Sequence, residues 1–406
     1  RIFTAVAGAV LALPALMLTA ALSPTLRARA EQGAAVLQRS TTSEEDRFAA
    51  LTAAFYDEYL QRFPTDSTTF GAHRYDHAVE DLSPAGLDAR ADWLRGWEAR
   101  FKAIAPAALS RRSAQDLRLL QHGLGRRLFS VSGLRDHHRR PMIYLGLATS
   151  TVYALIKRDF APLQDRLAAV LSREAQIPAI LRAGQANLDQ VPRASLDLAL
   201  DQLPGIVAFF REDVPRAFAD LPKDQLAALA DRTQTVVDAI TAFERHLRTQ
   251  VAPKALPSFA LGDDLFRRKL HWDLWIDEPL PELLARGEAE LKRLQTEFRA
   301  TAARIDPKRP PAQVQLDLQK NHPTADQVIP ETQARLQAIR DFITARGLLT
   351  LPSPLLPQVR ETPPFLRATT LAAMDTPGPF EPKALEAYYY VTLPEPSWTH
   401  AQSEDF

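Results

Sequence analysis

Residues 284–305, LARGEAELKRLQTEFRATAARI, give the clearest indication of the fold class. Apolar or small side chains recur there every three or four residues, and they are Leu284, Gly287, Leu291, Leu294, Phe298, Ala302 and Ile305. This spacing places them on one face of an α-helix, where they can pack lengthwise against another helix. Asp306-Pro307 then ends the predicted helix.

Other segments repeat this helical periodicity. Helices are predicted over residues 43–63, 113–128, 163–181 and 226–247, the third of them interrupted by Pro178. Ser43 with Asp46, and Ser113 with Asp116, resemble the capping boxes that begin a helix. Most of the 31 prolines lie between the periodic segments, so they separate helices without disrupting them.

One segment has the composition of a β-strand. Tyr388, Tyr389, Tyr390, Val391 and Thr392 are aromatic or β-branched, and Pro394 follows them. The predicted fold is therefore all-α, a multi-helix scaffold with a short β-strand or hairpin near residues 387–393. The strand needs a partner, which is either a second short strand or an extended ligand along its free edge.

Composition limits the class of protein. Hydrophobic residues make up 46% of the 406 residues and charged residues 24%, which is typical of a folded globular protein. The 49 basic and 49 acidic side chains cancel, so we expect no nucleic-acid partner. Cysteine is absent, which excludes disulfides, thiolate catalysis, cysteine-ligated zinc and the lipid-modified cysteine of a bacterial lipoprotein.

The N-terminal residues predict export. Ile2 to Leu22 is uncharged and apolar, and Ala28-Arg29-Ala30 fits a signal-peptidase site. Residues 1–30 are predicted to be a signal peptide cleaved before Glu31, which gives a periplasmic or secreted bacterial protein. The alternative is an uncleaved anchor, the one case in which a membrane is a partner. A leader should begin with Met, so the start at Arg1 suggests that the true start is missing.

The mature chain is predicted to contain two regions. An N-terminal helical region covers residues 31–252, and a second helical region with an edge strand covers 253–406. The boundary is placed near Val251 to Pro257, where prolines follow a long helix.

Two histidine pairs were considered as metal ligands. His73 and His77 have the spacing of a helical zinc motif, but Arg74 occupies the place of the general-base glutamate. We expect His73, Tyr75 and Asp76 to stabilise a turn by hydrogen bonds. The adjacent His137 and His138 project in different directions, and a solvated loop is expected there.

No catalytic residue is assigned. The sequence has no Gly-x-Ser-x-Gly elbow, and Asp263-Asp264 beside basic residues is typical of a helix N-terminus with paired charges. We assign substrate binding to Tyr388, Tyr389 and Tyr390, because consecutive tyrosines on a strand direct hydroxyl groups to both faces. Packing of these rings in the core is an equally good explanation.

Four stretches resemble a known bacterial family. They are residues 63–76 (FPTDSTTFGAHRYD) followed by Asp81-Leu82-Ser83, residues 259–262 (FALG), residues 359–363 (VRETP), and residues 388–394 (YYYVTLP) with 398–406. Their order matches that of the family called domain of unknown function 885. The resemblance covers the chain from about Phe48 to its end.

The resemblance implies an exported, α-helical, zinc-metallopeptidase-like protein. In the family the chemistry is attributed to a His-Glu-x-x-Pro-Gly-His segment and a later glutamate, in which two imidazoles hold zinc and the glutamate polarises bound water. This chain lacks that segment and stops just before the place where the zinc helix is expected. Zinc is therefore expected in the full-length protein, but no residue of this chain is expected to bind it.

The leading hypothesis is that this chain is the N-terminal part of an exported zinc-dependent peptidase acting on short peptides, and is itself inactive. The alternatives are a non-catalytic helical binding or scaffold protein of the cell envelope, and a pseudoenzyme of the same fold.

Overall fold

The computed structural model describes residues 43–320, 322–383 and 386–394. These residues are mainly helical with one small sheet, which confirms the predicted fold class. The predicted signal peptide at residues 1–30 lies outside the described residues. None of the helices in the described ranges is long and apolar enough to cross a membrane.

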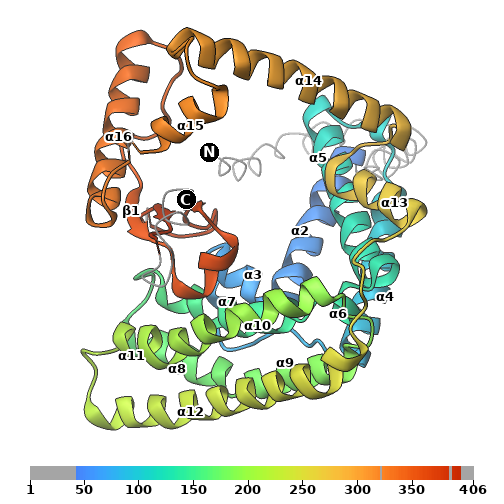
Figure 1. The fold of residues 1–406 in the computed structure, drawn as a ribbon. Helices are drawn as coiled ribbons and strands as arrows, with labels where there is room; N and C mark the ends of the chain where they lie inside the picture. Colours follow the sequence, from blue (N-terminus) through green and yellow to red (C-terminus); the bar gives the residue numbers. More distant parts are fainter. Residues whose placement is uncertain (1–42, 321, 384–385, 395–406) are drawn as a thin grey trace, which may run out of the picture.

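The helices form an open ring (Figure 1). One side contains α2 (Glu44–Arg62), α4 (Pro84–Lys102), α5 (Arg111–Leu128), α6 (Asp136–Arg139) and α13 (Asp263–Leu274). The base contains α3 (Pro64–Thr69), α7 (Met142–Ile156), α8 (Leu163–Glu174), α9 (Ile177–Asn187), α10 (Arg193–Ala208), α11 (Val214–Ala217) and α12 (Lys223–His246). The far side contains α14 (Leu280–Ile305), from which α15 (Pro311–Gln319) and α16 (Ala325–Arg346) lead to the sheet.

Short helical turns connect or extend these helices. Turns of 3₁₀ helix are η3 (His73–Tyr75), η4 (Pro106–Ala108), η8 (Ala252–Lys254) and η9 (Pro364–Thr369). Turns of π helix extend α5, α10 and α12, and they are η5 (Phe129–Leu134), η6 (Phe209–Asp213) and η7 (Leu247–Val251). Arg135 follows η5 with φ 52°, a left-handed conformation that non-glycine residues seldom adopt.

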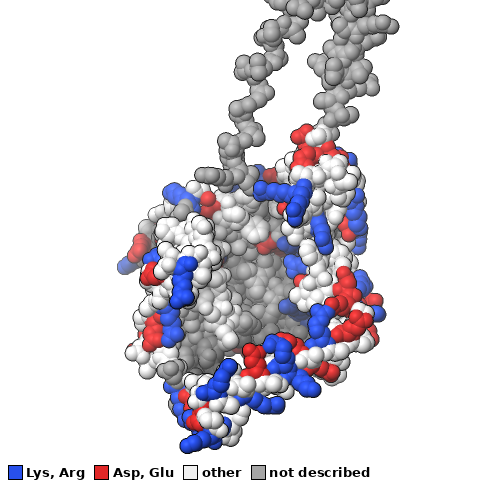
Figure 2. Space-filling model, turned by 90° about the horizontal axis from the view of Figure 1, so that it is seen from above, with Lys and Arg blue, Asp and Glu red and all other residues white. Residues whose placement is uncertain are grey.

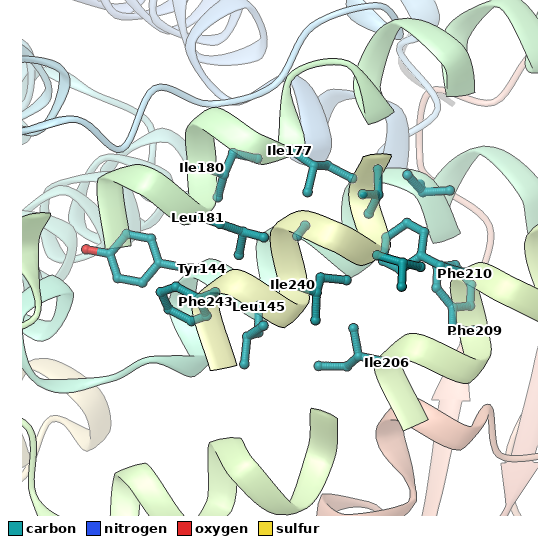
Figure 3. Packing of buried hydrophobic residues seen from close by; sticks show 14 of the residues in the cluster. Tyr144, Leu145, Ile177, Ile180, Leu181, Ile206, Phe209, Phe210, Ile240 and Phe243 are labelled. Atoms are coloured by element: carbon teal, nitrogen blue, oxygen red, sulfur yellow. The ribbon is translucent and has the colours of Figure 1, made fainter. Parts of the chain in front are cut away.

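The main hydrophobic core lies in the base of the ring, where α7, α9, α10 and α12 meet (Figure 3). Tyr144, Phe210 and Phe243 are fully buried there. A second core combines aromatic rings of α2 and α4 with leucines of α5. The Phe55 ring centroid lies 5.3 Å from that of Trp97 and 5.6 Å from that of Phe101. Such aromatic pairs add about 0.5–1.5 kcal/mol each to the burial of their surface.

The two predicted helix caps have different outcomes. Ser43 Oγ accepts a hydrogen bond from the Asp46 backbone N–H at 3.1 Å, which confirms the first. The second prediction is wrong, because α5 begins one turn earlier. Ser110 Oγ accepts from the Ser113 N–H at 3.2 Å, while the Ser113 hydroxyl donates to Glu45. Ser110 and Ser113 are both residues that commonly cap a helix, and Ser110, the first of them, is the N-cap.

Residues 284–305, which indicated the fold class, are helical and form most of α14. Its apolar side chains are nevertheless exposed: Leu284 by 63%, Leu291 by 57% and Phe298 by 46%. Only Ala302 of this helix is buried, near α15. The expected lengthwise packing of α14 against another helix is therefore wrong within the described part of the chain.

The sheet contains β1 (Gln358–Glu361), β2 (Ala372–Asp375) and β3 (Tyr388–Val391) in the order β1-β3-β2. β3 pairs with β1 in parallel and with β2 in antiparallel orientation. The strand was correctly located, but the prediction of an edge strand is wrong, because both of its edges are hydrogen-bonded. Its partners were not recognised because each has only four residues and alternates little in polarity.

The boundary between residues 31–252 and 253–406 stays a prediction, although burial changes there. Both hydrophobic cores consist almost wholly of residues before 252. After it, the buried hydrophobic residues of the described ranges are Ala302, Val314, Val359, Phe365, Tyr388 and Tyr390.

Candidate functional site

The three tyrosines of β3 have different environments. Side chains alternate between the faces of a strand, so Tyr388 and Tyr390 share one face and Tyr389 projects from the other. Tyr388 and Tyr390 are buried, with 3% and 6% of their surface exposed, whereas Tyr389 is half-buried. The shared face of Tyr388 and Tyr390 packs toward α7, which supplies the rest of the site.

Tyr390 forms a hydroxyl pair with Tyr153 of α7. The two hydroxyl oxygens lie 2.6 Å apart. One hydroxyl donates to the other, and the accepting hydroxyl keeps its own proton for a further acceptor. Burial raises the pKa of both phenols, so the pair stays protonated at neutral pH. It therefore acts as a hydrogen-bond donor and not as a base.

Tyr388 lies between two guanidinium groups. Arg158 is 4.8 Å from the Tyr388 ring centroid and Arg360 is 3.8 Å from it. Arg158 is buried, and its Nε donates to the Glu386 carbonyl at 2.9 Å. Arg360 is exposed and donates to Gln358 at 3.0 Å, but it forms no ion pair within the described residues. The Tyr388 ring thus holds in place a guanidinium that pairs with no carboxylate of the described ranges.

An ion pair joins α7 to the sheet. Lys157 Nζ lies 3.0 Å from each carboxylate oxygen of Asp375 in β2. Arg158 also donates to the Asp375 carbonyl at 2.7 Å. Burial lowers the pKa of Lys157, and Asp375 partly offsets that effect. These contacts fix β2 and β3 against the end of α7.

A hollow of about 550 Å³ opens beside these groups, and we call it the sheet hollow. Its polar lining consists of Tyr153, Lys157, Glu212, Asp213, Arg216, Arg360, Glu361, Thr362, Arg367 and Tyr390. Thr362 is buried, with 1% of its surface exposed, and its Oγ1 has no hydrogen-bond partner within the described residues.

The sheet hollow is suited to binding acceptor groups. Its volume is in the range of small-molecule sites. The hydroxyl pair and the Arg360 guanidinium are donors, and carbonyl or carboxylate oxygens are the acceptors that such donors select.

Only one of the three predicted substrate-binding residues lines the sheet hollow. Tyr390 does so, whereas Tyr388 is covered by guanidinium groups and Tyr389 does not line the hollow. The sequence interpretation missed Tyr153, because it lies in a mainly apolar helix in which nothing distinguishes its hydroxyl from the other hydroxyl groups. It also gave no role to Arg360 and Thr362, although the stretch 359–363 had been singled out for its family resemblance.

The histidines have structural contacts. His73 Nδ1 lies 2.9 Å from Asp76, which confirms the hydrogen-bonded turn, and its Nε2 lies 3.4 Å from Glu381. His138 is part of the short helix α6, where a loop was expected. Its Nδ1 lies 2.8 Å from Asp189 Oδ1. Asp263-Asp264 begins α13 as predicted, with Arg268 3.8 Å from Asp264.

The described residues do not fit a zinc ion. Among them, no three or more His, Cys, Asp or Glu side chains lie close enough together to hold a metal. A zinc site needs three or four such ligands.

Comparison with known proteins extends this description. The family model described as "Bacterial protein of unknown function (DUF885)" matches residues 64–405. A solved structure described as "a putative lipoprotein of unknown function from Shewanella oneidensis" has a TM-score of 0.66 and 24% sequence identity. The match covers 88% of this chain and 66% of that chain. No curated protein is significantly similar to the sequence. At this identity the likeness concerns the fold.

Proposed function

The chain belongs to the DUF885 family of bacterial proteins, and on this premise we propose that it is the helical, peptide-binding part of an exported zinc-dependent peptidase acting on short peptides. The observation that carries the proposal is the sheet hollow, whose donors suit the carbonyl and carboxylate oxygens of a peptide. Zinc and the hydrolytic step come from the family resemblance, and we assign them to no residue described here.

Export is part of the same proposal. The apolar, uncharged residues 2–22 and the Ala28-Arg29-Ala30 site support it. The Shewanella oneidensis protein is described as "a putative lipoprotein", which is consistent with a place in the cell envelope. The 406 residues contain no cysteine, and lipid attachment is not part of the proposal.

Peptide binding is tested with Tyr390→Phe. Removing one hydroxyl removes one hydrogen bond, worth about 1 kcal/mol, so the affinity for trialanine should fall about fivefold. Isothermal titration calorimetry on the 406-residue chain measures this change. Tyr389→Phe is the matched control, because it removes the same atom from the opposite face of β3 and should leave the affinity unchanged. Absence of trialanine binding to the wild type, or equal loss in both variants, would contradict the proposal.

Hydrolysis gives a second prediction. The purified chain from Glu31 to Phe406 should cleave no member of a short-peptide library, with or without added zinc, because its described residues present no metal-binding group. Cleavage is measured by mass spectrometry before and after chelation. Activity that disappears on chelation would show that our view of the metal site is wrong.

Two other hypotheses remain, a helical scaffold of the envelope and a pseudoenzyme. The coding sequence after the Phe406 codon distinguishes these two hypotheses from the proposed peptidase. A His-Glu pair followed by a later His and Glu would exclude the scaffold, and their absence would exclude the peptidase. A pseudoenzyme would retain the fold with defective ligands.

A further inference from the structure

A second hollow lies on the opposite side of the ring from the sheet, between α4, α5, η5 and α13, and we call it the basic hollow. Its volume is about 330 Å³. Its charged lining consists of Arg90, Arg126, Arg127, Arg140, Lys269, Asp136 and Asp273. Five basic groups face two carboxylates, so positive charge is in excess in a chain whose net charge is zero. Charge on the face shown in Figure 2 is mixed by comparison.

The two carboxylates are already engaged. The Ser130 hydroxyl donates to Asp136 at 2.6 Å, and Lys269 pairs with Asp273. Arg127 donates to the Tyr59 hydroxyl at 2.5 Å and lies 3.6 Å from Asp66. The protein thus neutralises part of the charge of this hollow with groups of its own.

Three guanidiniums have no such partner. The guanidinium groups of Arg90, Arg126 and Arg140 form no hydrogen bond or ion pair within the described part of the chain. Arg90 is half-buried, and its guanidinium lies 4.9 Å from the centroid of the Phe63 ring. Burial lowers the pKa of Arg90, and attraction to Glu80, Asp66 and Asp81 offsets that effect only in part. Arg126 and Arg140 are exposed at the rim.

The wall of the basic hollow has an unusual backbone. It includes the π-helical turn η5, and Arg135 in the left-handed conformation follows that turn directly. Single π turns occur often at functional sites, and strained residues persist where the surroundings enforce them. The turn places Phe129 and Ser130 in the lining beside the basic groups.

We propose that the basic hollow binds an oxyanion, in the form of a phosphate group. Guanidinium groups match the oxygens of phosphate in paired hydrogen bonds, and three unpaired guanidiniums at one hollow can serve one such group. The phosphate belongs either to a soluble phosphate compound or to a lipid headgroup at the membrane surface. This site is separate from the sheet hollow and does not depend on the proposed peptidase function.

The test is titration of the 406-residue chain with inorganic pyrophosphate at low ionic strength. The wild type should bind it saturably, and Arg126→Gln and Arg140→Gln should each weaken binding about tenfold. Both residues are exposed, so folding should be unaffected. Arg299→Gln is the matched control, because Arg299 is an exposed arginine of α14 outside the basic hollow. Raising the salt concentration should weaken binding, because it screens exposed charges.

Sedimentation with vesicles identifies the source of the phosphate. Binding to vesicles containing phosphatidylglycerol, but not to pure phosphatidylcholine, and its loss in Arg126→Gln would assign the headgroup. Pyrophosphate binding without sedimentation would assign a soluble phosphate compound. Absence of both in the wild type, or equal weakening by Arg299→Gln, would overturn the proposal.

Discussion

Replacement of Glu174 by glutamine is expected to raise the free energy of unfolding at pH 8 by about 4 kcal/mol and to leave it almost unchanged at pH 4. Glu174 of α8 is fully buried, and its nearest polar partner is the Thr233 hydroxyl, 3.3 Å from each carboxylate oxygen. Burial raises the pKa of Glu174 to about 8, an effect that Thr233 and Arg232 only partly offset.

The sign of this effect follows from proton binding. In the folded chain Glu174 keeps its proton up to about pH 8, whereas in the unfolded chain it ionises above its ordinary value of 4.5. Between these values the unfolded state binds fewer protons, so stability falls as the pH rises. Below pH 4.5 both states are protonated and the glutamate costs nothing. Glutamine has almost the same shape and stays neutral. The Glu174→Gln variant should therefore not lose this stability between pH 4.5 and about pH 8.

Urea unfolding of wild type and Glu174→Gln between pH 4 and 8 measures the difference. His137 acts in the opposite direction, because burial lowers its pKa to about 4, but it contributes equally to both proteins. Glu282→Gln, an exposed carboxylate of α14, serves as the control and should keep the wild-type pH dependence. Parallel curves for wild type and Glu174→Gln would contradict a buried, protonated carboxyl group.

The helices could be predicted because their signals are local. Phe48, Phe55 and Tyr59 at helical spacing, together with the Ser43 cap, specify α2 from a few neighbouring residues. Periodic apolar residues likewise specify α12 and α14. What α14 packs against could not be predicted in this way. An apolar stripe specifies that a face will be covered but not by which segment, and the described chain leaves this face exposed.

The candidate sites depend on contacts between distant residues, which sequence spacing does not reveal. Tyr390 was selected because of its strand, but its partner Tyr153 lies 237 residues earlier. The basic hollow combines α4 and α5 with α13, so Arg90 meets Lys269 only after folding. Neither Arg90 nor Lys269 is distinguished by the sequence around it, because basic residues occur throughout the chain.

Arg173 of α8 is another residue whose importance appears only in the fold. It is fully buried, and it connects α7 and α8 with the segment of residues 64–76 that carries the family resemblance. Its Nη1 donates to the Thr151 carbonyl at 2.6 Å, and its Nη2 donates to the Pro64 carbonyl at 3.0 Å. The Thr68 hydroxyl accepts a third hydrogen bond, at 2.6 Å.

Arg173→Met is therefore expected to destabilise the chain by about 3–5 kcal/mol. Methionine replaces much of the side-chain volume, but it removes the hydrogen bonds to the Thr151 and Pro64 carbonyls and to the Thr68 hydroxyl. It also removes the positive charge that faces Asp76 and Glu80. Urea unfolding measures the loss. Arg193→Met, which breaks the exposed pair with Asp197, should cost no more than about 1 kcal/mol. In hydrogen exchange, residues 64–76 should lose protection first, because Arg173 holds that segment against α7. Equal costs for the two variants would mean that the segment is held by its apolar contacts alone.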